Sequence, residues 1–236
     1  MTTKKHPLSL KFQKRDDQII ESDGVLPMGS RIMFFIGSKG SSKTTTILNL
    51  LSLKESPYKK YFKNIILISP TAHADKKLGK LYEELERDDK VYDELSDATV
   101  EDVISRLEEW NSESKKPIEN LIIIDDSSDK LPNGKKPSAI TKLFTNSRHI
   151  RASVWLVAHK FTSIPPIIRN QVDCLFIFKQ NSRYEIESMK KNLNVDEDVF
   201  TRNLATATEI PFGFLFVDLM GGRPKYFNKF DELSDK

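Results

Sequence analysis

Residues 31–53 read RIMFFIGSKGSSKTTTILNLLSL, which joins an apolar strand, a loop of small residues and a helical pattern. The loop itself, residues 37–44, is GSKGSSKT. Small residues let consecutive backbone N–H groups point at phosphate oxygens, and the helix that follows adds the positive end of its dipole. The order strand, loop, helix is the context that such a loop requires. The segment therefore predicts a phosphate-binding loop.

The loop and the residue after it supply the predicted ATP contacts. These are Gly37, Ser38, Lys39, Gly40, Ser41, Ser42, Lys43, Thr44 and Thr45. Lys43 would reach the β- and γ-phosphates, the hydroxyl of Thr44 would hold Mg²⁺, and Lys39 is a weaker candidate for the γ-phosphate. Ser42 departs from the pattern G-x-x-x-x-G-K-[ST], which has its second glycine there. Taken alone, the loop is also compatible with a Gly/Ser-rich turn before a helix.

The bulk composition fits one large α/β domain. The chain has 236 residues, of which 38% are hydrophobic and 30% charged, and its net charge is +3. This length suffices for a substantial core, and the charge neither requires nor excludes a nucleic-acid partner. The single cysteine, Cys174, lies in an apolar run and predicts a buried thiol in a reducing compartment. We expect no membrane segment and no signal peptide.

Short apolar runs alternate with helical patterns along the chain. We expect strands at 32–36, 64–69, 121–125, 154–158 and 174–178, and helices at 45–53, 78–87, 100–110, 138–144 and 184–193. Continuous apolar strands separated by helices predict a mainly parallel central sheet with helices on both faces. Residues 9–13 alternate like an edge strand, and Thr99 is the expected N-cap of its helix. A C-terminal β-hairpin would turn at Gly221 and Gly222.

Two carboxylates follow the third of these strands. The sequence LIIIDD ends in Asp125 and Asp126, which places both side chains at the carboxyl edge of the sheet, where ligands of α/β proteins bind. Asp125 would hold Mg²⁺, and Asp126 would orient or deprotonate the attacking water. A solvated pair of aspartates at a strand end is the competing interpretation, which the upstream phosphate loop disfavours.

Three further side chains are candidates for sensing or completing the site. His159 ends the strand VWLVA, where a polar residue can sense the γ-phosphate; a capping or packing histidine is equally compatible. Arg148 lies just before that strand and could reach the nucleotide of a neighbouring subunit as an arginine finger. Arg169 raises the same question more weakly. A surface arginine in a local salt bridge is the ordinary alternative for both.

The pieces together resemble a known family. The order of phosphate loop, LIIIDD, FTNSRHIRASVWLVAHK, SIPPIIRNQVD and CLFIF is similar to the FtsK–HerA superfamily of DNA-pumping ATPases. Within it, the chain most resembles the poxvirus-type genome-packaging ATPases of large cytoplasmic DNA viruses and virophages. The resemblance covers roughly residues 25–230 and rests most on the segment from Arg148 to Arg169. It implies a P-loop NTPase fold of the ASCE/RecA-like kind, with residues 1–24 as an arm packed on a single ATPase domain of residues 25–236.

The resemblance also implies roles for single residues. Lys43 and Thr44 match the Walker A pair, Asp125 the Mg²⁺-associated acid, Asp126 the catalytic acid and Arg148 the arginine that acts in trans. Two positions depart from the family pattern. The sensor, commonly glutamine, is His159 here, and Ser42 places a Cβ where the backbone approaches phosphate.

The partners follow from the same resemblance. It implies ATP-driven translocation of double-stranded DNA into a preformed capsid by a homo-oligomeric ring, a pentamer or hexamer, at a capsid portal or vertex. The expected location is the host cytoplasm, at the viral factory or with the virion, and not a secreted one. Lys130, Lys135 and Lys136 lie in the loop after Asp126 and are the candidate DNA contacts. A charged loop that only aids solubility fits these lysines as well.

Two other functions stay open from the sequence. Ser42 and the absence of a catalytic glutamate would suit a nucleotide-binding assembly subunit with little turnover. A cellular or plasmid DNA-transfer ATPase of the same superfamily is the other alternative, which the small size disfavours. A small-molecule kinase fits poorly because no Arg-rich lid segment is present.

Overall fold

The computed structural model describes residues 25–74, 78–133, 138–193 and 195–233. The expected N-terminal arm, with its edge strand at residues 9–13, lies outside the described residues, and so do Lys135 and Lys136. Within the described part, no helix is both long enough and apolar enough to span a membrane.

The described strands form one sheet with the order β3-β2-β4-β5-β1-β6-β7-β8-β9. Their bounds are β1 Ile32–Ile36, β2 Asn64–Ile68, β3 Val91–Tyr92, β4 Asn120–Ile124, β5 Ala152–Ala158, β6 Cys174–Phe178, β7 Phe214–Asp218, β8 Lys225–Asn228 and β9 Asp231–Glu232. The strands from β3 to β6 pair in parallel, and β7 to β9 continue the sheet antiparallel. The predicted fold class and C-terminal hairpin are confirmed.

The continuous apolar strands are explained by two separate cores. Alternate residues of β1 point to opposite faces, so Phe34 packs in one buried cluster and Phe35 in the other. Every residue of β1, β4, β5 and β6 is buried. A strand covered on both faces can be apolar at every position, which is the pattern seen in the sequence.

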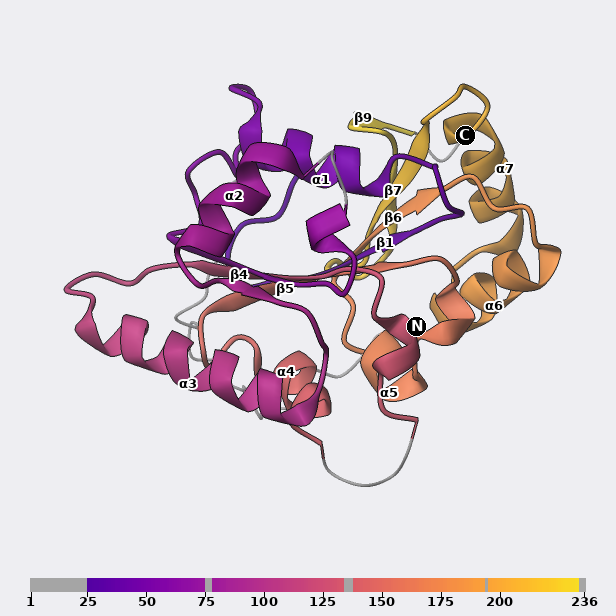
Figure 1. The fold of residues 1–236 in the computed structure, drawn as a ribbon. Helices are drawn as coiled ribbons and strands as arrows, with labels where there is room; N and C mark the ends of the chain where they lie inside the picture. The colour runs from indigo at the N-terminus through magenta and orange to yellow at the C-terminus, as the bar shows by residue number, and fades with distance from the viewer. Residues whose placement is uncertain (1–24, 75–77, 134–137, 194, 234–236) are drawn as a thin grey trace, which may run out of the picture.

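Helices cover both faces of the sheet (Figure 1). Their bounds are α1 Lys43–Ser52, α2 Gly79–Arg87, α3 Asp97–Glu113, α4 Ala139–Asn146, α5 Pro166–Arg169, α6 Arg183–Leu193 and α7 Glu197–Ala207, with short 3₁₀ turns η1 Ala72–Ala74, η2 Ser128–Lys130 and η3 Phe161–Ser163. Buried residues of α1 and α2 belong to the core on one face, and those of α3 to α7 to the core on the other. Figure 1 shows α1 and α2 above the sheet and α3 and α4 below it.

The start of α3 corrects one expectation. Its N-cap is Ser96, whose side chain accepts a hydrogen bond from the Thr99 backbone N–H. Thr99, the expected N-cap, is therefore a residue of the first helical turn. The short elements β3, β9 and α5, and the longer helix α7, were not expected from the sequence. These differences lie outside the central strands.

The strand order fixes where the candidate residues lie. In the sheet, β5 separates β1 from β4. Because β1, β4 and β5 are parallel, the phosphate loop, Asp125 and His159 follow their strands at the same edge of the sheet. Arg148 precedes β5 and therefore belongs to the opposite edge.

Candidate nucleotide-binding site

Glycines shape the loop between β1 and α1. A Cβ on Gly37 would lie 2.6 Å from the Cβ of Phe178 and 2.7 Å from Oγ of Ser41, so no larger residue fits there without movement. Gly40 has a φ of +80°, in the left-handed region that glycine adopts without strain. The loop therefore presents backbone rather than side chains, as a phosphate cradle requires.

Ser42 also adopts a left-handed conformation, with φ 76° and ψ 23°, at the N-cap of α1. Its carbonyl oxygen accepts hydrogen bonds from Thr46 N at 2.9 Å and Thr46 Oγ1 at 3.0 Å, which hold the first helical turn. The usual glycine of this position is explained by the positive φ. Serine keeps the same backbone at a cost of about 1–2 kcal/mol, because its Cβ crowds the following carbonyl.

Lys43 is buried, with 7% of its surface exposed. Its Nζ donates to Gly37 O at 2.7 Å and to Ser38 O at 3.0 Å, which places the ammonium group against the loop backbone. A cation held there is positioned for the phosphate oxygens that the loop would surround.

His159 links the loop to the two aspartates. Its Nδ1 lies 3.4 Å from Lys43 Nζ and its Nε2 lies 3.1 Å from Oδ1 of Asp126. The neutral tautomer with hydrogen on Nε2 satisfies both contacts, because Nδ1 then accepts from the ammonium while Nε2 donates to the carboxylate. The structure thus brings together three of the predicted catalytic side chains from three separate segments.

The aspartates after β4 differ in their surroundings. Asp125 is half-buried and its backbone N–H donates to Ile68 O, while Ser127 Oγ donates to Asp125 O at 3.0 Å. Asp126 is exposed and has a φ of 53°, an uncommon conformation that aspartate tolerates better than most residues with a side chain. Uncommon backbone conformations of this kind are often retained at functional sites, where they aim a side chain.

The residues that would hold Mg²⁺ are compatible with it. Thr44 lies in the first turn of α1, which follows β1, and Asp125 follows β4, two strands away at the same edge of the sheet. Hydroxyl and carboxylate oxygens suit this ion, which keeps several waters and takes further ligands from nucleotide phosphates. Among the described residues, no group of three or more His, Cys, Asp or Glu side chains is placed to hold a metal ion.

Arg148 is not part of this cluster. Its Nη2 donates to Oδ1 of Asp173 at 3.1 Å, and Oδ2 of the same carboxylate accepts from Ile32 N at the start of β1. Burial raises the pKa of the Asp173 carboxyl, while the Ile32 N–H and Arg148 lower it. Arg148 is thus fixed at the amino edge of the sheet, on the far side from the phosphate loop of its own chain.

The remaining candidates lie apart from the cluster. Arg169 places its guanidinium carbon 5.2 Å from the ring centre of Phe161, and burial lowers its pKa. Lys130 is exposed on η2 and pairs with Asp129 at 3.7 Å, and Lys39 is exposed in the phosphate loop.

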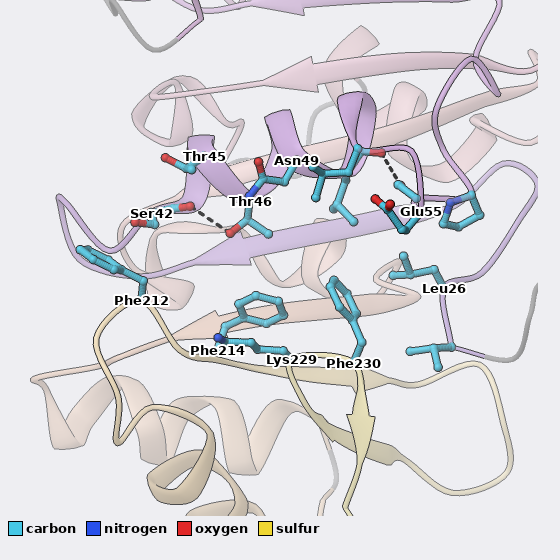
Figure 2. Close-up of a pocket in the computed structure, with 15 residues that line it drawn as sticks. Leu26, Ser42, Thr45, Thr46, Asn49, Glu55, Phe212, Phe214, Lys229 and Phe230 are labelled. Carbon is cyan, nitrogen blue, oxygen red and sulfur yellow. Dashed lines mark hydrogen bonds between the residues drawn. The ribbon is translucent and has the colours of Figure 1, made fainter.

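A large hollow adjoins the phosphate loop. About 720 Å³ lies between the outer side of α1 and the C-terminal segments that carry Phe212, Phe214 and Phe230 (Figure 2). Sequence reasoning missed these aromatic residues because they are distant from the motif along the chain. Their only signal was aromatic enrichment in the predicted hairpin.

The family comparison decides the classification. The model of the family described as "Poxvirus A32 protein" matches residues 26–210, most of the chain. The chain belongs to the poxvirus A32 protein family. This confirms the sequence-based prediction of a poxvirus-type relative.

Curated relatives of this A32 family member come from two viruses. Uncharacterized protein 075L of Invertebrate iridescent virus 6 is 28% identical over 165 residues, which cover 70% of this chain and 60% of that protein. Uncharacterized protein 015R of Frog virus 3 (isolate Goorha) is 27% identical over 158 residues, which cover 66% of this chain and 46% of that protein. The chain thus spans about half the length of the curated relatives it matches.

Solved structures share the fold of this A32 family member. The genome packaging NTPase B204 of Sulfolobus turreted icosahedral virus 2, in complex with ATP-gammaS, matches with a TM-score of 0.61 and 18% identity, covering 84% of this chain and 96% of that one. The DNA-packaging ATPase B204 of Sulfolobus turreted icosahedral virus matches with a TM-score of 0.63 and 18% identity, covering 83% and 96%. At this level of identity, the match establishes a common fold.

Proposed function

We propose that this chain is the ATP-hydrolysing motor that translocates double-stranded viral DNA into a preformed capsid. The observation that carries the proposal is the convergence of Lys43, Asp126 and His159 at the phosphate loop. Membership of the A32 family and the fold shared with B204, described as a DNA-packaging ATPase, support it. The proposed sites of action are the viral factory in the host cytoplasm and a capsid portal or vertex.

In the proposed reaction, the backbone N–H groups of residues 37–44 surround the phosphates of ATP, and Lys43 neutralises charge that develops on the β- and γ-phosphates. Asp126 accepts a hydrogen bond from the attacking water and orients it in line with the γ-phosphate. His159 lies 3.1 Å from the Asp126 carboxylate and also contacts Lys43. It therefore connects Asp126, the proposed general base, to the lysine that would contact the phosphates.

Thr44 and Asp125 are the residues proposed to hold Mg²⁺. When bound, the ion would offset the charge of the phosphate oxygens during phosphoryl transfer. Chelation of magnesium should therefore abolish hydrolysis while leaving the fold intact.

The arginine that completes the site is proposed to come from a neighbouring subunit. Arg148 lies at the opposite edge of the sheet from the loop of its own chain, which supports action in trans within a pentameric or hexameric ring. Lys130 and the lysines at 135 and 136 stay candidates for gripping the DNA backbone. Arg169, whose guanidinium stacks on Phe161, is the weaker candidate for a second arginine.

Phosphate release with Mg²⁺, ATP and duplex DNA tests the proposal. We expect turnover that DNA stimulates, and that Asp126→Asn lowers at least 100-fold, within the range for loss of a general base. Asp129→Asn is the matched control. Asp129 is exposed, lies three residues after Asp126 and forms an ion pair with Lys130. Equal loss in both variants, or no turnover in the native chain, would contradict the proposal.

A second candidate is an assembly subunit that binds nucleotide with little turnover. Ser42 favours it, because this serine has a Cβ at the position where the pattern has glycine and the backbone approaches phosphate. The same assay separates the two, since clear turnover that depends on Asp126 excludes a binding subunit. A DNA-transfer ATPase of a cell or plasmid would share the turnover but would not act on capsids.

A further inference from the structure

The hollow beside α1 has a position that a nucleotide can use. Its lining includes Ser42 from the phosphate loop and Thr45 from the first turn of α1. Figure 2 shows α1 on one side of the hollow and Phe214 and Phe230 on the other, with Phe212 at the Ser42 end. A volume of about 720 Å³ falls within the range of small-molecule sites.

Phe212, at the Ser42 end of the hollow, is unusual in its exposure and in its backbone conformation. It is 66% exposed and has a φ of 63°, so a large aromatic ring is held outside the core on a strained backbone. The turn that carries it is tightly folded, because Gly213 N donates to Ile210 O at 3.1 Å and a Cβ on Gly213 would lie 2.2 Å from Ala207 O. The ring is therefore presented by a rigid support.

A second hollow meets the first at the same ring. It is lined by residues 38–41 of the phosphate loop, by Lys179 and by residues 208–213, and Phe212 belongs to both linings. Phe212 thus lies between the second hollow, at the phosphate loop, and the first hollow, beside α1, which is called the slot below. A ligand with a phosphate end and a flat ring system would contact both.

We propose that the base of the bound nucleotide enters the slot between α1 and Phe214 and stacks on Phe212. The inference rests on the proposed function, since it assumes that ATP phosphates occupy the loop. With the γ-phosphate end toward Lys43 and Asp126, the α-phosphate end emerges beside Thr45, which is exposed and lines the slot. Asn49 and Lys229, further along the lining, offer polar groups to the ribose or the base edge.

The test compares two ligands that share phosphates but not a base. Dissociation constants of ATP and of inorganic tripolyphosphate, both with Mg²⁺, are measured for the native full chain, Phe212→Ala, Phe212→Trp and Ile210→Ala. Loss of a base-stacking aromatic should weaken ATP binding about tenfold and leave tripolyphosphate binding unchanged. Phe212→Trp should restore ATP binding. Ile210→Ala is the control, because Ile210 is 53% exposed on the same turn but lines only the second hollow.

The outcomes separate this inference from the function on which it rests. Equal ATP affinity in the native chain and Phe212→Ala would overturn the stacking, and so would a parallel loss of both ligands, which indicates a disturbed loop. If the native chain bound neither ligand, the proposed nucleotide site itself would fail, whereas native ATP hydrolysis with no effect at Phe212 would sink the base pocket alone.

Discussion

Ser42 is the residue at which the sequence pattern and the backbone disagree. The position has φ 76°, which glycine adopts freely and serine does not. We predict that Ser42→Gly raises the free energy of unfolding by about 1 kcal/mol, since relief of strain exceeds the entropy gained by the unfolded chain. Chemical denaturation measures this change. The Ser42→Gly variant should also keep its ATP affinity within a few-fold of the native value and hydrolyse ATP faster. Much tighter ATP binding with unaltered turnover would count against this expectation.

Ser38→Gly is the control for that prediction. Ser38 lies in the same loop but is not among the described residues with positive φ. Glycine there relieves no strain and increases the freedom of the unfolded chain, so stability should fall slightly. Equal stabilisation by both substitutions would show that the loop gains from any glycine.

The Arg148–Asp173 pair gives a pH-dependent prediction. Arg148 lowers the pKa of a carboxyl that burial raises, so Arg148→Ala should raise it further. If the pKa of Asp173 is higher in the folded state, ionisation of this carboxyl lowers the free energy of unfolding as the pH rises through its titration range. The loss of stability in Arg148→Ala, about 1 kcal/mol or less for so exposed an arginine, should be larger at pH 7.5 than at pH 4.5. Melting curves at the two pH values measure it; a loss independent of pH would exclude this account.

The residues of the loop were predictable because their spacing is local. Lys43, Thr44 and Asp125 follow directly from short motifs. The pairing of Arg148 with Asp173 was not, since Arg148 lies before β5 and Asp173 lies before β6, and only the fold of the sheet brings these two segments together. Phe212 carried no signal beyond the aromatic enrichment of the predicted hairpin, because an aromatic residue before a strand is ordinarily part of the core.

At the scale of elements, the buried strands were the most predictable part. The expected ranges 32–36 and 174–178 agree with β1 and β6, because short continuous runs rich in β-branched and aromatic residues suit strands that are covered on both faces. The two-residue strand β3 is too short for any pattern. The helix α7 did have a signal, since Asp196 caps it and Phe200 and Leu204 lie one turn apart on its buried side.

The cap of α3 yields a prediction at this scale. The Ser96 side chain accepts from Thr99 N at 3.1 Å and satisfies a backbone donor that would otherwise lack a partner. Ser96→Ala should therefore lower the free energy of unfolding by about 1 kcal/mol. Ser112→Ala, at the exposed end of the same helix, is the control and should change stability by less than about 0.5 kcal/mol in a denaturant titration. Equal losses of stability in the two variants would show that the Ser96 cap does not stabilise the helix.

At the scale of the whole molecule, the sheet separates Arg148 from the nucleotide loop of its own chain. If the arginine acts in trans, Arg148→Ala and Asp126→Asn should each be inactive alone, and mixing them should restore part of the phosphate release. Only an interface with an intact loop on one side and an intact arginine on the other can be active. Unrestored activity, or full activity of Arg148→Ala alone, would contradict this arrangement.

Arg151→Ala is the matched control for the mixing experiment. Arg151 lies at the same edge and pairs with Glu119 at 3.0 Å, with burial similar to that of the Arg148 pair. It should lose comparable stability and keep its phosphate release. Loss of hydrolysis in both variants would indicate a structural effect of the edge rather than a finger.

The central claim is that hydrolysis at Asp126 drives movement along duplex DNA. The most direct measurement is the displacement of a third strand bound to a DNA duplex, followed in time with Mg²⁺ and ATP. The account predicts displacement by the native protein, and none by Asp126→Asn or with a non-hydrolysable ATP analogue. Rapid ATP hydrolysis by the native protein without any displacement would contradict it.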